Sequence, residues 1–220
     1  MVTVVDSPKV KEVFTDGVLL HNISWATYES LLLDNPDSPN PRLTYDRGDL
    51  LIMVTSPEHE EINDIFRLLI HILAEEFEVE RRAFGSTTYK RKDLQRGFEP
   101  DSCFYFKHEA QMRGKKRLDL TKDPPPELVV EIDITSLSIR KLPLFAAFGI
   151  PEVWRFDGLQ VEIHLLEKGT YRKSENSLAL PKVTAAVITR FIKEGLQMGH
   201  LKWVKKVRAW AHQVKADEPK

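Results

Sequence analysis

The most regular pattern of apolar and polar positions in the chain has helical spacing and follows Ser56-Pro57. Serine is a favoured N-cap and proline fits the first helical position, so this pair predicts where a helix begins. The apolar positions recur on one face of that helix: Ile62, Ile65, Phe66, Leu69, Ile72, Leu73 and Phe77. A single apolar face of this length predicts a helix that packs against a sheet.

The first turn of this predicted helix carries Glu58, His59 and Glu60. At about 100° per residue, Glu58 falls within the apolar stripe, His59 falls at its edge and Glu60 points nearly opposite, toward solvent. We therefore expect Glu58 and His59 to approach the sheet. The alternative is that the acidic residues here only stabilise the start of the helix through its dipole.

Shorter patterns elsewhere alternate with a period of two and predict strands. A hairpin is predicted around Arg47-Gly48, with strands over 42–45 and 50–54. Further strands are predicted over 99–106, 127–134, 152–156, 159–166 and 170–173, and further helices over 24–33, before 148, over 183–194 and over 201–214. This order predicts an α/β (α+β) fold with a central mixed β-sheet flanked by helices, and not a doubly wound parallel sheet.

Length and composition indicate one ordinary globular domain. With 220 residues, we expect a single domain over 1–220, with a core from about 24 to 181 and C-terminal helices from about 183 to 214. No apolar run approaches the length of a membrane span, and the N-terminus does not have the pattern of a signal peptide. Cys103 is the only cysteine, so no intramolecular disulfide is possible. These features predict a cytoplasmic protein without a membrane partner.

Basic residues gather in two stretches, although the net charge of the chain is only −1. The first stretch holds Arg81, Arg82, Lys90, Arg91, Lys92 and Arg96, and the second, over 113–122, holds Arg113, Lys115, Lys116, Arg117 and Lys122. Such clusters can contact a phosphate backbone, and the first is the candidate for nucleic-acid binding. The alternative is that both are solvated loops that keep the protein soluble.

Carboxylates interrupt two otherwise apolar predicted strands, which is unusual because a buried charge is costly unless it is paired or bound to metal. Alternation places Glu99 and Asp101 on one face of the first strand, and Glu131 and Asp133 on one face of the second. Oxygen ligands that converge on one point suit Mg²⁺ or Mn²⁺. The alternative is an ordinary half-exposed strand whose polar side faces water.

Lys141 and Cys103 lie close to these carboxylates in the predicted arrangement. Lys141 follows Asp133 by eight residues, near a predicted helix start where the dipole disfavours a lysine. Its amine could instead reach toward the carboxylates and a bound phosphate; the alternative is an ordinary surface lysine. Cys103 shares a strand face with Asp101 and is expected to be a buried thiol and not a nucleophile, since no basic partner can be assigned to it.

Together these residues resemble the pattern of the PD-(D/E)XK nucleases and, more specifically, that of the Uma family of restriction-type endonucleases. The matching motifs are Ser56-Pro57-x-His59, Pro100-Asp101, Val129-Val130-Glu131-Ile132, Lys141-(three residues)-Phe145 and Gly149-Ile150-Pro151-Glu152-Val153-Trp154. The similarity runs from about Ser24 to Pro181, and its last block is the most specific.

The resemblance implies a restriction-endonuclease-like core and a Mg²⁺- or Mn²⁺-dependent endonuclease that hydrolyses phosphodiester bonds in DNA. It implies Asp101 and Glu131 as metal ligands, the Ile132 carbonyl as a third ligand and Lys141 as a displaced catalytic lysine. Asp133 would add a ligand, directly or through water. The supporting residues would be His59, which matches a family histidine, with Glu58 and Glu99 beside the site.

Two positions depart from the family pattern. Asp133 stands where the family has a lysine two residues after the glutamate, and Phe145 stands where tyrosine is frequent. The sequence therefore also allows a degenerate nuclease fold that binds nucleic acid or a protein without cutting. A third possibility is an interaction protein that docks through the helix over 201–214, although one apolar face there is more typical of core packing. By analogy with restriction enzymes, a homodimer is expected.

Overall fold

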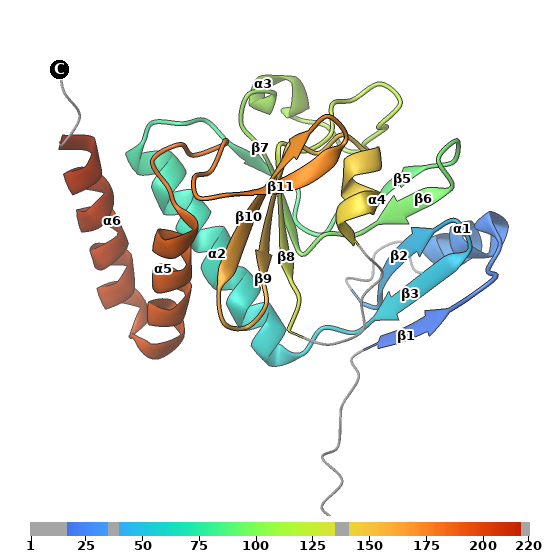
Figure 1. Cartoon of the computed structure of the whole chain (residues 1–220), viewed down its shortest axis with the longest axis horizontal. Helices are drawn as coiled ribbons and strands as arrows, with labels where there is room; N and C mark the ends of the chain where they lie inside the picture. The colour runs from blue at the N-terminus through green and yellow to red at the C-terminus, as the bar shows by residue number, and fades with distance from the viewer. Residues whose placement is uncertain (1–16, 35–39, 135–140, 217–220) are drawn as a thin grey trace, which may run out of the picture.

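The computed structural model describes residues 17–34, 40–134 and 141–216. Within these ranges, two β-sheets and the helices around them form a mixed α/β arrangement, as the sequence predicts (Figure 1). The central sheet has six strands in the order β11-β10-β9-β8-β7-β4, and the small sheet has five strands in the order β1-β3-β2-β6-β5.

The central sheet is mixed, which confirms the expectation. Its strands are β4 (Arg82–Ala83), β7 (Ser102–Tyr105), β8 (Leu128–Ile132), β9 (Glu152–Phe156), β10 (Val161–Glu167) and β11 (Thr170–Ser174). The neighbours β8 and β9 are parallel, and the other pairs are antiparallel. All five residues of β8 are buried, so both faces of this strand are covered and it reads as an almost continuous apolar run.

Long helices cover one face of the central sheet: α2 (Pro57–Glu76), α5 (Ala185–Gln197) and, packed against both, α6 (His200–Ala216) (Figure 1). Ser56 caps α2, because its Oγ accepts a hydrogen bond of 3.2 Å from the backbone N–H of His59. Trp203, Val207 and Ala211 of α6 are buried in the core that this helix shares with the sheet. The apolar face of α6 therefore packs internally, which favours core packing over a docking role.

The opposite face of the central sheet carries α4 (Lys141–Ala147). Phe145 of α4 packs into a second core cluster with Cys103, Val129 and Val153, which point to this side of β7, β8 and β9. Pro143 lies in the first turn of α4, as expected, and Gly149 follows the helix with a positive φ of 72°. A short helix, α3 (Glu109–Met112), follows β7.

The small sheet was not expected as a separate layer. It consists of β1 (Gly17–Leu20), β2 (Arg42–Asp46), β3 (Asp49–Met53), β5 (Tyr89–Arg91) and β6 (Arg96–Phe98). The predicted hairpin forms β2 and β3, and its turn residues Arg47 and Gly48 have positive φ values of 50° and 105°. On this sheet packs α1 (Trp25–Asp34), whose Tyr28 ring stacks on Tyr45 with centroids 5.0 Å apart.

The chain passes from the small sheet to the central sheet through Glu99, Pro100 and Asp101, between the end of β6 and the start of β7. The strand predicted over 99–106 is therefore present only as β7, and its predicted start at 99 is wrong. Pro100 has no N–H to donate to a ladder, which disfavours a continuous strand at this point. Asp101 consequently lies at the junction of the two sheets and not on an alternating strand face. None of the helices in the described ranges is long and apolar enough to cross a membrane.

Candidate active site at the junction of the two sheets

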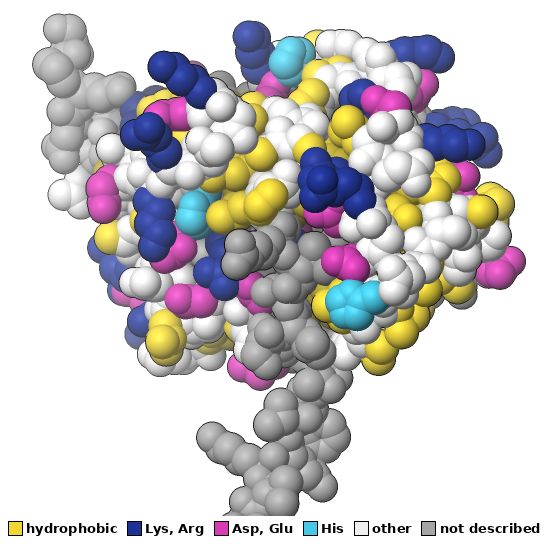
Figure 2. All heavy atoms as spheres, turned by 45° about the vertical axis from the view of Figure 1, so that its right-hand side comes forward, with side chains coloured by type: hydrophobic (Ala, Val, Ile, Leu, Met, Phe, Trp, Pro, Cys, Tyr) yellow, Lys and Arg dark blue, Asp and Glu magenta, His cyan; other side chains and the backbone are white. Residues whose placement is uncertain are grey.

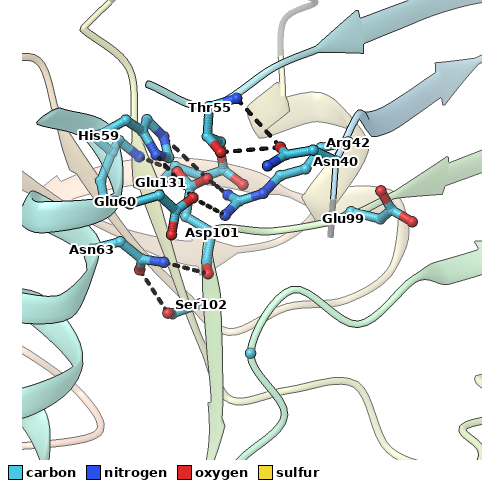
Figure 3. Close-up of polar contacts among 12 residues, drawn as sticks. Asn40, Arg42, Thr55, His59, Glu60, Asn63, Glu99, Asp101, Ser102 and Glu131 are labelled. Atoms are coloured by element: carbon cyan, nitrogen blue, oxygen red, sulfur yellow. Dashed lines mark hydrogen bonds and ion pairs between the residues drawn. The ribbon is translucent and has the colours of Figure 1, made fainter. Parts of the chain in front are cut away.

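Asp101 is the centre of a buried polar cluster at the sheet junction, and its side chain is almost fully buried (Figure 3). Its Oδ2 accepts a hydrogen bond of 2.6 Å from the backbone N–H of Ile132, which fixes it beside the end of β8. Its backbone carbonyl accepts a hydrogen bond of 3.1 Å from Asn63 of α2, and Asn63 in turn accepts one of 2.8 Å from Ser102. These bonds hold Asp101 against both β8 and the first half of α2.

The other carboxylate oxygen of Asp101 meets two basic side chains. Arg42, at the start of β2, donates to Oδ1 from the small sheet and also donates to Glu60 over 2.9 Å. His59 brings its Nε2 to 3.2 Å from the same Oδ1. Asp101 is therefore reached from the small sheet, from the central sheet and from the N-terminal turn of α2, as Figure 3 shows.

Glu131 lies next to this cluster on β8 and is also almost fully buried. Lys141, the first residue of α4, forms an ion pair with its Oε2. The second oxygen, Oε1, is buried without a hydrogen-bond partner among the described residues. The structure thus brings together three of the predicted site residues, Asp101, Glu131 and Lys141, and it adds His59 beside Asp101.

The charges of these groups are strongly shifted by their surroundings. Burial would raise the pKa of Asp101, but His59, Lys141 and Arg42 together hold that pKa below its usual value. Burial raises the pKa of Glu131 to about 7, against the opposing charge of Lys141. Burial would lower the pKa of Lys141, yet Glu131 and Asp101 raise it, so the ammonium form is favoured. The cluster therefore holds an ionised aspartate, a charged lysine and a glutamate that titrates near neutrality.

A divalent cation fits one feature of this cluster particularly well. An acceptor oxygen that is buried without a donor, such as Glu131 Oε1, is costly unless a cation or a water molecule satisfies it. Asp101 and Glu131 supply the hard oxygen donors that Mg²⁺ or Mn²⁺ prefers. Among the residues that the structure describes, no group of three or more His, Cys, Asp or Glu side chains is arranged to hold a metal ion, so further ligands would be backbone oxygens or water.

Three other carboxylates that the sequence singles out have hydrogen-bond partners or exposure of their own, although Asp133 lines a cavity together with Glu131 and Lys141. Asp133 accepts hydrogen bonds of 2.8 and 3.2 Å from Arg155 on β9. Glu99 faces the small sheet, where the backbone N–H of Leu43 donates to it over 2.9 Å, and burial raises its pKa. Figure 3 shows its carboxylate pointing away from Asp101.

Glu58 is the third, and here the helical-wheel argument was wrong. Glu58 is exposed and does not approach the sheet. Glu60 is exposed as expected, with half of its side chain accessible, but it also accepts a hydrogen bond from Arg42. That contact exists because the small sheet brings Arg42 to the first turn of α2.

The basic residues of the first stretch are placed in two groups. Arg81 and Arg82 follow the C-terminal end of α2, which is about 25 Å along the helix from His59 in its first turn. Lys90, Arg91 and Arg96 lie on β5 and β6 of the small sheet, and Lys92 follows them exposed. The structure therefore does not gather this stretch around Asp101.

Most of these basic side chains already have acidic neighbours. Arg82 pairs with Glu109, Lys90 with Glu29, Arg91 with Asp93 and Arg96 with Asp46, at 2.5 to 3.1 Å. Figure 2 agrees, because Lys and Arg side chains alternate with Asp and Glu side chains on the face it shows and form no continuous basic patch there.

Two residues of the cluster were missed by reasoning from the sequence. Arg42 carries no local signal, since its partner Asp101 lies 59 residues away on another sheet. Asn63 could have been found, because it stands four residues after His59 and so shares its side of the helix, next to the apolar Ile62 and Phe66. A buried asparagine on an apolar helix face calls for a polar partner.

Comparisons with known proteins bear on the family and on the fold of this chain. A family model described as "Uma2: Putative restriction endonuclease" matches residues 25–198. Curated proteins give no match. Among solved structures, the chain is similar to one titled as a "putative nuclease belonging to DUF820" from Anabaena variabilis ATCC 29413, with a TM-score of 0.51 and 12% sequence identity. The match covers 77% of this chain and 99% of that one, and it shows a shared fold.

Proposed function

This chain belongs to the Uma2 family, and on that premise we propose that it is a metal-dependent endonuclease that hydrolyses phosphodiester bonds in DNA. The fold is restriction-endonuclease-like, in line with the nuclease-titled structure that it resembles. The observation that carries the proposal is the convergence of Asp101, Glu131 and Lys141 at the sheet junction, where one buried oxygen of Glu131 has no partner in the part of the chain that the structure describes.

In this proposal Asp101 and Glu131 hold Mg²⁺ or Mn²⁺, with the Ile132 carbonyl as a third oxygen and Asp133 as an outer ligand through water. A bound divalent ion supplies Lewis-acid stabilisation of the phosphate and lowers the pKa of its water ligand. The protein's own contribution is a rigid frame. Ile132 and Asn63 fix Asp101 through hydrogen bonds of 2.6 and 3.1 Å, so its carboxylate needs no reorganisation when the substrate arrives.

Lys141 is proposed to act on the substrate. Its ammonium, kept charged by Glu131 and Asp101, can donate to a nonbridging phosphate oxygen and stabilise the charge that develops there. The lysine enters from α4 and not from β8, which compensates for the absence of a lysine two residues after Glu131. His59 and Arg42 keep Asp101 ionised and are positioning residues.

Location, partner and assembly belong to the same proposal. A nuclease that acts on cellular DNA would work in the cytoplasm, and a single cysteine without an intramolecular disulfide is compatible with that compartment. Cleavage of both strands would be served by a homodimer with two such sites.

The test is nicking of supercoiled plasmid with Mg²⁺, with Mn²⁺ or with EDTA. We expect metal-dependent nicking by the wild type, its abolition in Asp101→Asn and Glu131→Gln, and a loss of roughly 100-fold in Lys141→Met. Asp123→Asn is a matched control, because Asp123 is a buried carboxylate paired with Lys115 outside the site, and nicking should persist.

The second candidate function is a degenerate nuclease fold that binds nucleic acid without cutting, favoured by the acid Asp133 at the usual lysine position. The same experiment separates the two. Absence of nicking by the wild type with either metal, together with DNA binding that survives EDTA and Asp101→Asn, would replace the enzyme by a binding protein.

A further inference from the structure

A cavity of about 300 Å³ lies directly beside the candidate active site, between α4 and the central sheet. Glu131 and Lys141 form one side of it, so any group bound there would be next to the proposed metal site. The volume is at the lower end of the range for small-molecule sites, enough for a single small ring system and its substituents. The proposed nuclease function gives roles to Glu131 and Lys141 but assigns no ligand to the cavity itself.

Strand register explains why polar groups line it. Glu131 of β8 is directly opposite Arg155 of β9, and Arg155 is directly opposite Glu162 of β10. Directly opposed residues point to the same face of a sheet, so the three form a row that leads away from the site. His164, two residues after Glu162, points to the same side and also lines the cavity.

The polar groups of this row still have bonding capacity. Arg155 binds Asp133 through Nε and Nη2, but its Nη1 lies 4.0 Å from Glu162, beyond hydrogen-bond distance, and its side chain is 36% exposed. His164 Nε2 lies 3.2 Å from Glu162. The other oxygen of Glu162 is paired with Lys173. A ligand would therefore meet the Nη1 donor of Arg155 next to carboxylate oxygens that already have partners and keep lone pairs to accept a further hydrogen bond.

The rest of the lining is apolar. Leu142, Pro143 and Phe145 of α4 face Val153 of β9 across the cavity. Phe145 packs against Phe98 in an edge-to-face arrangement, with ring centroids 4.9 Å apart. Apolar walls with a few polar groups on one side are typical of sites for flat heterocycles.

The charge of the cavity argues against a phosphate as the ligand. Among the described residues, each carboxylate of the cavity is already paired with a cation: Glu131 with Lys141, Asp133 with Arg155 and Glu162 with Lys173. An anion would therefore compete with these carboxylates for the cations, whereas a neutral ring with both donors and acceptors could bond to Arg155 and to the carboxylates at once.

From this geometry we propose that the cavity binds the base of an unpaired nucleotide adjacent to the phosphodiester at Asp101 and Glu131. The inference rests on the proposed nuclease function and adds a substrate class to it. A base can enter such a cavity only when it has left the duplex stack. Single-stranded DNA, or duplex DNA with an unpaired nucleotide, is therefore the preferred substrate.

The experiment measures binding without cleavage, with the full chain in EDTA. Saturation-transfer difference NMR is recorded for each of the four deoxynucleoside 5′-monophosphates. The probes that lack a base, 2-deoxyribose 5-phosphate and inorganic phosphate, are titrated as competitors of the nucleotide signal. We expect saturation transfer to the base protons of at least one nucleotide and at least tenfold weaker binding of both baseless probes. Equal binding of 2-deoxyribose 5-phosphate, or no nucleotide binding, would overturn the proposal.

Variants place the binding in the cavity. Arg155→Met and Glu162→Gln should each weaken nucleotide binding by about tenfold, the effect of losing one buried hydrogen bond. Arg172→Met is the matched control, because Arg172 is also a strand arginine paired with a glutamate, but it is exposed on β11 and does not line the cavity. Leu142→Trp, which fills the cavity from its apolar side, should remove binding without removing a charge. Unchanged binding in all three cavity variants would also overturn the proposal.

Plasmid nicking by the same samples separates this inference from the proposed function. Nucleotide binding without nicking would retain the cavity and reject the nuclease. Nicking without nucleotide binding would retain the nuclease and reject the cavity as a base site.

Discussion

Lys141 of α4 forms an ion pair with Glu131 of β8, ten residues earlier in the chain. The register of β8 against β9 turns Glu131 toward the face that α4 covers, and Lys141 is the first residue of that helix. The same cation also acts on Asp101, whose pKa it helps to lower.

The first prediction concerns the stability of this pair. Lys141→Met leaves the buried Glu131 carboxylate without its cation, so we expect the free energy of unfolding to fall by about 3 kcal/mol at pH 8 in EDTA. Urea unfolding measures it. The control is Lys206→Met, which removes an exposed pair with Glu194 and should cost less than about 1 kcal/mol. Equal losses in the two variants would show that Glu131 does not depend on Lys141.

The free energy of unfolding of Lys141→Met can also be measured with and without Mg²⁺. A divalent cation at Glu131 would replace the lost positive charge, so we expect Mg²⁺ to restore part of the lost stability in Lys141→Met. The double variant Lys141→Met with Glu131→Gln should not respond. A response of the double variant equal to that of the single variant would place the metal elsewhere.

The second prediction concerns Cys103, whose side chain is fully buried. It contacts Tyr89 and belongs to the core cluster that also contains Phe145 of α4. Burial raises the pKa of its thiol to about 12, so at pH 8 the thiol and not the reactive thiolate is present. We expect a thiol reagent to leave the native protein unmodified at pH 8 and to modify one thiol per chain in urea. Rapid modification of the native protein would contradict this burial.

Much of the site could be predicted from local sequence. Pro100-Asp101 and Glu131 could be identified because a carboxylate in an apolar strand is costly unless it is paired or bound to metal. Lys141 could be identified because the helix dipole disfavours a positive charge at the start of a helix. The structure brings these three together. Local spacing also predicted α2, its cap at Ser56 and the hairpin around Gly48.

The remainder depended on contacts between distant segments. No spacing rule indicates that Arg42 reaches Asp101, since that contact exists only because the small sheet lies against the first turn of α2. The same layer explains why the exposed Glu60, and not Glu58, contacts Arg42. Likewise, Arg155 and Glu162 join Glu131 in one row only through strand register, which alternation within one strand cannot fix.

The third prediction concerns Glu152, a fully buried acid of the family-like block before Trp154. Its two oxygens accept three N–H donors, from Trp154 Nε1 at 2.6 Å and from the backbone of Leu178 and Ala179 at 3.0 and 2.7 Å. Glu152→Gln keeps the shape but turns one acceptor into a donor that faces another donor. We expect a loss of about 1–3 kcal/mol in the free energy of unfolding, with unchanged plasmid nicking at 25 °C.

Intrinsic fluorescence of the four tryptophans during urea unfolding would measure the loss in Glu152→Gln. A suitable comparison is Glu175→Gln, an exposed acid in the segment just after β11, which should change the free energy of unfolding by less than about 0.5 kcal/mol. A Glu152→Gln protein as stable as the wild type would mean that the three donors find other acceptors.

The fourth prediction separates stability from function at two helix caps. Ser56 caps α2 and Thr184 caps α5, each by accepting a hydrogen bond of 3.2 Å from a backbone N–H three residues later. Ser56→Ala and Thr184→Ala should therefore each lower the free energy of unfolding by about 1 kcal/mol. Their consequences for nicking should differ, because the bond at Ser56 goes to His59, which lies 3.2 Å from Asp101.

Loss of the Ser56 cap would loosen the turn that carries His59 and Glu60, and with it the contacts that keep Asp101 ionised. We expect Ser56→Ala to nick plasmid several-fold more slowly at 25 °C, under conditions where both variants are folded, and Thr184→Ala to nick at the wild-type rate. Ser56→Asp should restore the rate, since aspartate is an equally good cap. Equal rates for Ser56→Ala and Thr184→Ala would show that the first turn of α2 stabilises the fold without contributing to catalysis.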